Sequence, residues 1–95
     1  MEKQELEANL KLLEEKGILE KTDEKYQLTH TFVSTVNMAT IKLIIEQNVK
    51  PKDALNMAII QTLLATFKQG LTSQQIEKLL LTLKPFIINQ LKVLT

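Results

Sequence analysis

The sequence predicts a mainly helical fold with one β-hairpin, made of a helix and hairpin over residues 1–30 and a bundle of three helices over residues 31–95. Three observations predict it. Apolar residues recur at helical spacing through most of the chain. Only 2 glycines and 2 prolines interrupt that spacing. A short polar run between two segments of β character follows the first helix. At 95 residues and 44% hydrophobic content, we expect a single folded domain over residues 1–95.

The first helix is predicted from leucines on one face and from a glycine that ends it. Leu6, Leu10 and Leu13 fall at positions i, i+4 and i+7. Gly17 follows the last turn, where a glycine adopts the left-handed conformation that other residues avoid. Leu13 and Ile18 then occupy the positions of the apolar contact in a Schellman cap. The helix should therefore stop at Gly17.

A β-hairpin is predicted directly after this glycine. Residues 18–21 and 25–28 have some β character, and they flank the short polar segment 22–24. Two antiparallel strands joined by a turn are the simplest structure for this pattern.

This helix–glycine–hairpin run resembles part of a known family. The pattern L-x-x-L-x-x-K-G-I-L-x-K, followed by a few polar residues and Y-x-L-T, is similar to the end of the recognition helix and the wing of winged-helix regulators of the MarR and PadR kind. The resemblance covers roughly the first third of the chain. It implies a wing that touches DNA, and Lys21, Lys25 and Gln27 are then the candidate nucleic-acid contacts. Two helices precede the recognition helix in those families, so we expect a truncated winged-helix-like unit here.

The charge distribution disfavours DNA reading. Residues 1–30 carry five lysines against eight acidic residues, whereas residues 31–95 carry seven lysines against three. An acidic surface repels the phosphate backbone, whose attraction to cations supplies most non-specific affinity. All 12 cationic side chains are lysine, and arginine is the commonest specific reader of guanine. DNA is a possible but disfavoured partner.

The second and third helices are predicted from residues that favour the starts and ends of helices. Thr29 or Thr31 can cap a helix that runs to about residue 48. Pro51 suits the first position of the next helix, which should run to about residue 69 and stop at Gly70. The apolar stripes of these two helices comprise Phe32, Val36, Ala39 and Leu43, and Leu55, Ala58, Ile59, Leu63 and Phe67.

The fourth helix carries the candidate interface. Thr72 and Gln75 have the spacing of a capping box. Pro85 should kink or restart the helix, because proline cannot donate to the preceding turn. Beyond it, apolar residues surround the helix axis, which favours either a homodimer interface or the central helix of the bundle. The candidate dimer interface comprises Phe86, Ile87, Ile88, Leu91 and Leu94.

No residue pattern indicates catalysis. His30 is the only histidine, and Ser34 lies outside any G-x-S-x-G motif. Asp23 and Glu24 are explained by a turn. With 2 glycines and no cysteine, neither a phosphate-binding loop nor a thiolate metal site is expected. We expect no enzyme activity, no cofactor and no metal.

The sequence leaves three functional hypotheses. No signal sequence and no apolar run of about 20 residues is visible, so we expect a cytoplasmic protein without a membrane span. We favour an interaction or dimerisation protein, winged-helix-related, in transcriptional regulation; its partners would be a second copy or another protein. The alternative is a DNA-binding homodimeric regulator with phosphate contacts from lysines near residues 42–52, which steep salt dependence would reveal. A membrane-surface helix using Lys84 and Lys92 ranks last.

Overall fold

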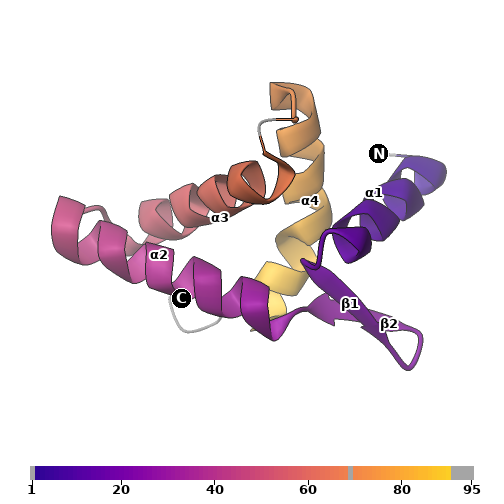
Figure 1. Cartoon of the computed structure of the whole chain (residues 1–95), viewed down its shortest axis with the longest axis horizontal. Coiled ribbons are helices and arrows are strands. Elements are labelled where there is room, and N and C mark those ends of the chain that lie inside the picture. The colour runs from indigo at the N-terminus through magenta and orange to yellow at the C-terminus, as the bar shows by residue number, and fades with distance from the viewer. Residues whose placement is uncertain (1, 69, 91–95) are drawn as a thin grey trace.

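The structure, a computed structural model, describes residues 2–68 and 70–90 and confirms a mainly helical fold with one hairpin (Figure 1). In chain order the elements are α1 (Lys3–Glu15), β1 (Leu19–Thr22), β2 (Lys25–Leu28), α2 (His30–Gln47), α3 (Pro51–Phe67) and α4 (Ser73–Gln90).

The helix α4 lies between the two halves of the molecule. Helices α2 and α3 run side by side, and α1 lies with the hairpin at the opposite end (Figure 1). Helix α4 packs against α1 and β2 as well as against α3. It is therefore a central helix, as one of the two sequence interpretations held, although its outer face remains open.

One buried cluster joins all six elements. Residues from α1, the hairpin and α2 meet residues from α3 and α4 within it. The core comprises Leu13, Ile18, Leu19, Leu28, Phe32, Val36, Leu43, Ala54, Ala58, Ile59, Leu63, Leu79 and Leu83. Three of the predicted stripe residues in α2 and three in α3 belong to it, so the helical spacing identified the inward faces of both helices.

The cap at Gly17 is the predicted Schellman motif. Gly17 has a φ of 76°. Its N–H donates to the carbonyl of Glu14 at 3.1 Å, and the N–H of Ile18 donates to the carbonyl of Leu13 at 3.0 Å. Leu13 and Ile18 are both buried. These bonds satisfy carbonyls that the end of a helix otherwise leaves without a donor.

The hairpin is tighter than the sequence suggested. Leu19 pairs with Leu28, and Thr22 pairs with Lys25, so the turn consists of two residues instead of the predicted three. Asp23 and Glu24 both have positive φ, 50° and 66°. This is the geometry of the primed turns that match the twist of two-residue hairpins.

The predicted starts of α2 and α4 are confirmed at the level of single hydrogen bonds. Thr29 caps α2, because its hydroxyl accepts from the N–H of Phe32 at 3.2 Å, and it also donates to the carbonyl of Gly17 at 2.7 Å. Thr72 and Gln75 form the capping box, with reciprocal bonds of 2.9 and 3.2 Å. These caps hold the connections between elements in fixed directions.

The predicted stop of α3 at Gly70 is wrong, and of the predicted kink or restart at Pro85 the restart is wrong. Helix α3 ends at Phe67, and Lys68 adopts the left-handed cap with a φ of 51°, so Gly70 does not provide the stop. Helix α4 runs through Pro85 instead of restarting there. Proline removes one helical hydrogen bond, but the packing of residues on both sides of Pro85 against the core keeps the helix in one piece.

Candidate interaction surfaces

An apolar groove lies between α3 and α4. It has a volume of about 950 Å³. We call it the α3–α4 groove. Its α3 wall is formed by Lys52, Leu55, Asn56 and Ile59. Its α4 wall is formed by Glu77, Leu80, Leu81, Lys84, Ile87 and Ile88.

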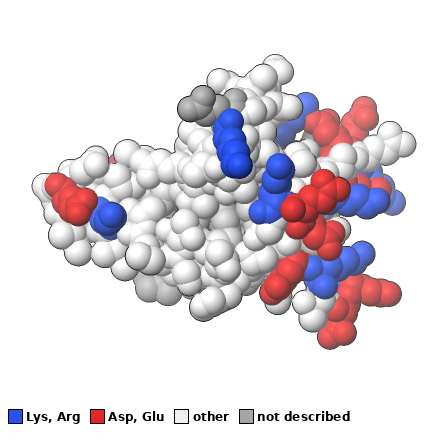
Figure 2. Space-filling model, viewed as in Figure 1, with Lys and Arg blue, Asp and Glu red and all other residues white. Residues whose placement is uncertain are grey.

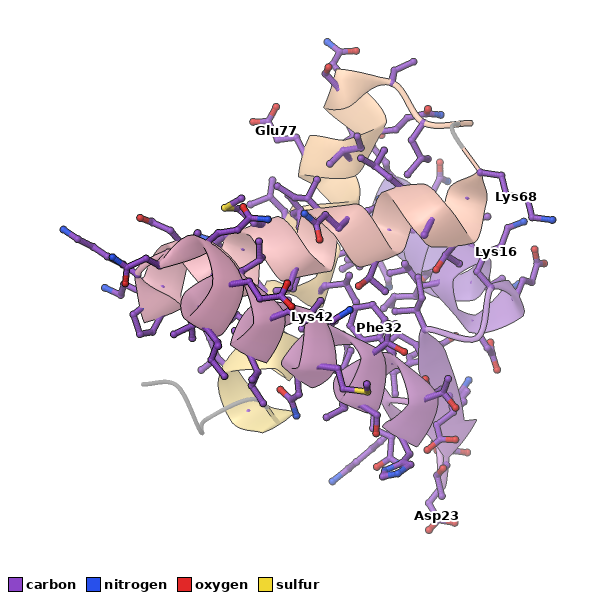
Figure 3. The ribbon with its side chains drawn as sticks, turned by 60° about the vertical axis from the view of Figure 1, so that its left-hand side comes forward. Lys16, Asp23, Phe32, Lys42, Lys68 and Glu77 are labelled. Carbon is purple, nitrogen blue, oxygen red and sulfur yellow. The ribbon has the colours of Figure 1, made fainter. Side chains whose placement is uncertain are left out.

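The groove exists because α4 buries only one of its apolar faces. Leu79 and Leu83 point into the core and are buried. Leu81 and Ile88 belong to the opposite face and are 55% and 56% exposed. Glu77 projects from α4 into open space beside α3 (Figure 3). The outer face of α4 therefore presents the large apolar side chains of Leu81 and Ile88 in alternation with the charged Glu77 and Lys84.

The structure divides the predicted dimer interface. Phe86 is half-buried and packs against the core, so it supports the fold of the single chain. Ile87 and Ile88 line the α3–α4 groove, and Ile88 is the more exposed of the two. Leu91 and Leu94 lie outside the described residues.

Glu77 and Lys84 of the groove were not predicted as interface residues from the sequence. Glu77, Leu81, Lys84 and Ile88 follow one another at intervals of four, three and four residues, which places them on one helical face. That spacing was visible in the sequence. It did not reveal an open surface, because a helical stripe looks the same whether a neighbouring helix covers it or not.

A second apolar stripe lies on α2. Met38, Ile41 and Ile45 share one face and are 67%, 53% and 75% exposed. They lie on the side of α2 away from its core residues Val36 and Leu43. We call these three residues the α2 stripe. It is a single helix face, whereas the α3–α4 groove has two walls.

The three residues proposed to contact nucleic acid do not lie on one face of the hairpin. Lys21 pairs across the strands with Tyr26, and its ammonium lies 5.5 Å from the centre of that ring. Lys25 and Gln27 project from the opposite face, because side chains alternate along a strand. The Gln27 amide donates to the carboxylate of Glu20 at 2.8 Å. The three candidates therefore do not form one basic surface.

Charged side chains gather at the end of the molecule formed by α1 and the hairpin. Figure 2 shows acidic and basic side chains intermixed there, while the middle of the same face is largely uncharged. Asp23 lies at the tip of the hairpin (Figure 3). The intermixed charges give the hairpin no single positive patch for a phosphate backbone.

One polar contact was not expected from the sequence. The Oγ of Ser34 lies 3.5 Å from the Nε2 of His30, one turn earlier in α2. Both residues belong to the first turns of that helix, and neither lines the α3–α4 groove. A nucleophile and base need donors placed for the developing oxyanion as well as mutual contact, so this pair is explained by helical spacing alone.

The hydroxyl of Tyr26 contacts a carboxylate of α1. It donates to Oε1 of Glu14 at 3.4 Å. Loss of hydration raises the pKa of the Tyr26 hydroxyl above its usual value, and the negative charge of Glu14 raises that pKa further. The neutral hydroxyl is therefore favoured in the folded state. This contribution to stability is present below the pKa of the unfolded tyrosine and is lost as pH rises through the folded pKa.

We expect the single tyrosine to titrate above its ordinary pKa of about 10. Glu14→Gln should lower the midpoint, because the glutamine keeps an acceptor but removes the charge. Loss of hydration should hold the variant above the ordinary value. The ultraviolet absorbance of tyrosinate against pH measures both midpoints, with the urea-unfolded chain as the control. A folded midpoint at or below that of the unfolded chain would contradict the assignment.

A smaller hollow of about 430 Å³ lies where Gly17 meets α2 and α3. Four threonines line it, together with Lys16 and Gln61. The hydroxyls of Thr35, Thr62 and Thr66 each donate to a carbonyl four residues earlier. Lys16 lies 5.5 Å from the centre of the Phe67 ring. The protons of three of the four threonines are thus engaged in the helices, which reduces the number of donors that the hollow offers to a ligand.

No protein-family model, curated protein or solved structure matches the chain. Within residues 2–68 and 70–90, no helix has both the length and the apolar character to cross a membrane. The same residues contain no group of three histidine or acidic side chains placed to hold a metal ion.

Proposed function

We propose that this protein is a small, non-enzymatic interaction protein of the cytoplasm that forms a homodimer through the α3–α4 groove. The observation that carries the proposal is the groove itself. Leu81 and Ile88 are more than half exposed within an apolar surface bounded by two helices. Contiguous exposed apolar surface of this kind marks interaction sites on soluble proteins.

An α-helix of a partner can contact both walls of the α3–α4 groove. An amphipathic helix laid into a groove buries apolar side chains against both sides of the groove. An element that approached the α2 stripe would gain contacts with one helix only. The groove therefore gives a partner helix the larger apolar contact, and we place the dimer there.

We propose transcriptional regulation as the setting, supported by the resemblance of residues 10–29 to the recognition helix and wing of MarR-type and PadR-type regulators. In this proposal the chain contributes dimerisation and protein contacts rather than base reading. The division of Lys21 from Lys25 and Gln27 on the two faces of the hairpin supports that assignment.

The test is the mass of the protein in solution after one groove residue is changed. Ile88→Asp places a charge in the apolar groove, and we expect the dimer to dissociate to a folded monomer, because a charge buried without a partner is strongly unfavourable. Sedimentation velocity measures the mass, and circular dichroism reports the fold.

The matched control is Ile45→Asp, which introduces the same charge at the most exposed isoleucine of the α2 stripe. We expect this variant to remain dimeric. A dimer that survives Ile88→Asp but dissociates with Ile45→Asp would move the interface to α2. A wild-type protein that stays monomeric at about 100 µM, where an interface of micromolar affinity is nearly saturated, would overturn the proposal.

A further inference from the structure

The outer face of α4 alternates charged and apolar residues. Glu77, Leu81, Lys84 and Ile88 lie in order along this face, and all four line the α3–α4 groove. Each is exposed. This face meets any helix that enters the groove, so its charge order restricts the direction and position of that helix.

Within the described part of the chain, no ion pair joins these two charges. Glu77 and Lys84 are seven residues apart, which separates their Cα atoms by about 10 Å along the helix axis. The neighbouring Lys78 instead pairs with Glu5 of α1. Lys52 also lines the groove, but no ion pair joins it to Glu77 among the described residues, so Glu77 and Lys84 are both open to charges on another molecule.

We propose that a second copy of this chain packs its α4 antiparallel to the first across the groove, with the two-fold axis passing between Leu80 and Leu81. This inference rests on the proposed homodimer and specifies its geometry. In an antiparallel pair centred there, Glu77 of each copy lies opposite Lys84 of the partner subunit. Both charges of both copies are then neutralised, and the exposed Leu81 side chains meet at the axis.

Two-fold symmetry makes this arrangement self-complementary. A symmetric dimer uses the same surface twice, so every favourable contact away from the axis occurs in duplicate. The midpoint between residues 77 and 84 falls between residues 80 and 81. The leucines at that midpoint both line the groove, so the centre of the charge pattern coincides with apolar side chains.

The same charges disfavour the other ways of pairing α4 with its copy. A parallel pair would place Glu77 beside Glu77 and Lys84 beside Lys84 of the two subunits. An antiparallel pair shifted to bring Leu81 opposite Ile88 would centre the axis near Lys84 and bring both lysines together. Like charges held close together cost free energy and oppose both arrangements.

Charge exchange tests the geometry. Glu77→Lys places lysine opposite lysine twice in each dimer, and Lys84→Glu places acid opposite acid twice. Because each exchange turns two attractions into two repulsions, we expect each variant to raise the dimer dissociation constant about tenfold or more at low salt. Sedimentation equilibrium at fixed ionic strength measures these constants.

Bringing opposite charges together again should restore dimer formation. An equimolar mixture of the Glu77→Lys and Lys84→Glu chains should form a heterodimer close to wild-type affinity, because opposite charges face each other at both positions again. The doubly exchanged chain should recover as a homodimer for the same reason. Glu46→Lys on α2, an exposed residue outside the groove, is the matched control and should leave the dissociation constant unchanged.

The outcomes separate the geometry from the dimer itself. If the charge variants dimerise as the wild type does while Ile88→Asp dissociates, the groove is the interface but the antiparallel arrangement is wrong. If both single exchanges weaken the dimer and the mixture does not recover, Glu77 and Lys84 do not face each other and the inference fails. A monomeric wild type would instead remove the homodimer on which the geometry rests.

Discussion

Replacing Phe32 with alanine is expected to lower the free energy of unfolding by about 3–5 kcal/mol, the usual cost of truncating a buried phenylalanine. Phe32 is 3% exposed and lies in the interior, where α2 faces the other elements (Figure 3). Its ring belongs to the cluster that joins the hairpin to the helices.

The environment of Phe32 determines where in that range the loss should fall. Phe32 also lines the hollow beside Gly17, so removal of the ring would connect the new cavity to solvent. Water can enter and solvate nearby polar groups, which limits the cost. The lost ring contacts are not replaced, however, because threonine side chains around the hollow are short. We therefore expect a loss near 3 kcal/mol rather than 5 kcal/mol.

Urea unfolding at a fixed protein concentration measures this effect, because the stability of a dimer depends on protomer concentration. Phe32→Leu is the control, since it keeps most of the apolar volume and should cost about 1 kcal/mol. A loss below about 1 kcal/mol for alanine would mean that the ring does not occupy the core in solution.

The local signals in this sequence were sufficient to predict most element boundaries. Thr72 and Gln75 form their box from contacts three residues apart, and Leu13, Gly17 and Ile18 complete their cap within a single turn. Each arrangement depends on backbone geometry that neighbouring residues impose on one another. Such motifs are visible in the sequence because all of their parts lie in one short segment.

The end of α3 shows where local signals fail. Gly70 was the obvious stop, but Lys68 adopts the left-handed conformation two residues earlier. A lysine in that conformation is strained relative to glycine. The tertiary position of α4 decides where the chain must leave α3, and that position is set by contacts with α1, β2 and α3. No local pattern around residue 68 records those contacts.

The interaction surface could be predicted only in part for a related reason. The apolar character of residues 86–88 was evident, but which side chains the chain itself would cover was not. Phe86 is held against the core, whereas Ile88 is left in the groove. The difference arises from the direction in which α4 crosses α3 (Figure 1). Glu77 and Lys84 can be recognised as interface residues only once that crossing shows which face of α4 is open.

Replacing Gly17 with valine is expected to lower the free energy of unfolding by about 2 kcal/mol or more, because a β-branched residue is an outlier at positive φ. A Cβ at this position would meet nothing within 4 Å. The cost therefore comes from the backbone conformation and not from a clash. The chain cannot relieve the strain by unwinding the cap, because Leu13 and Ile18 on either side of it are buried.

A series of substitutions at Gly17 separates this cause from others. Asparagine tolerates the left-handed conformation better than alanine, and alanine better than valine. We therefore expect stability to fall in the order glycine, asparagine, alanine, valine, measured from urea unfolding at one protein concentration. Equal losses for asparagine and valine would show that side-chain bulk, rather than φ, controls stability at this position. The predicted order would instead establish that the left-handed φ at residue 17 is required for the cap that joins α1 to the hairpin.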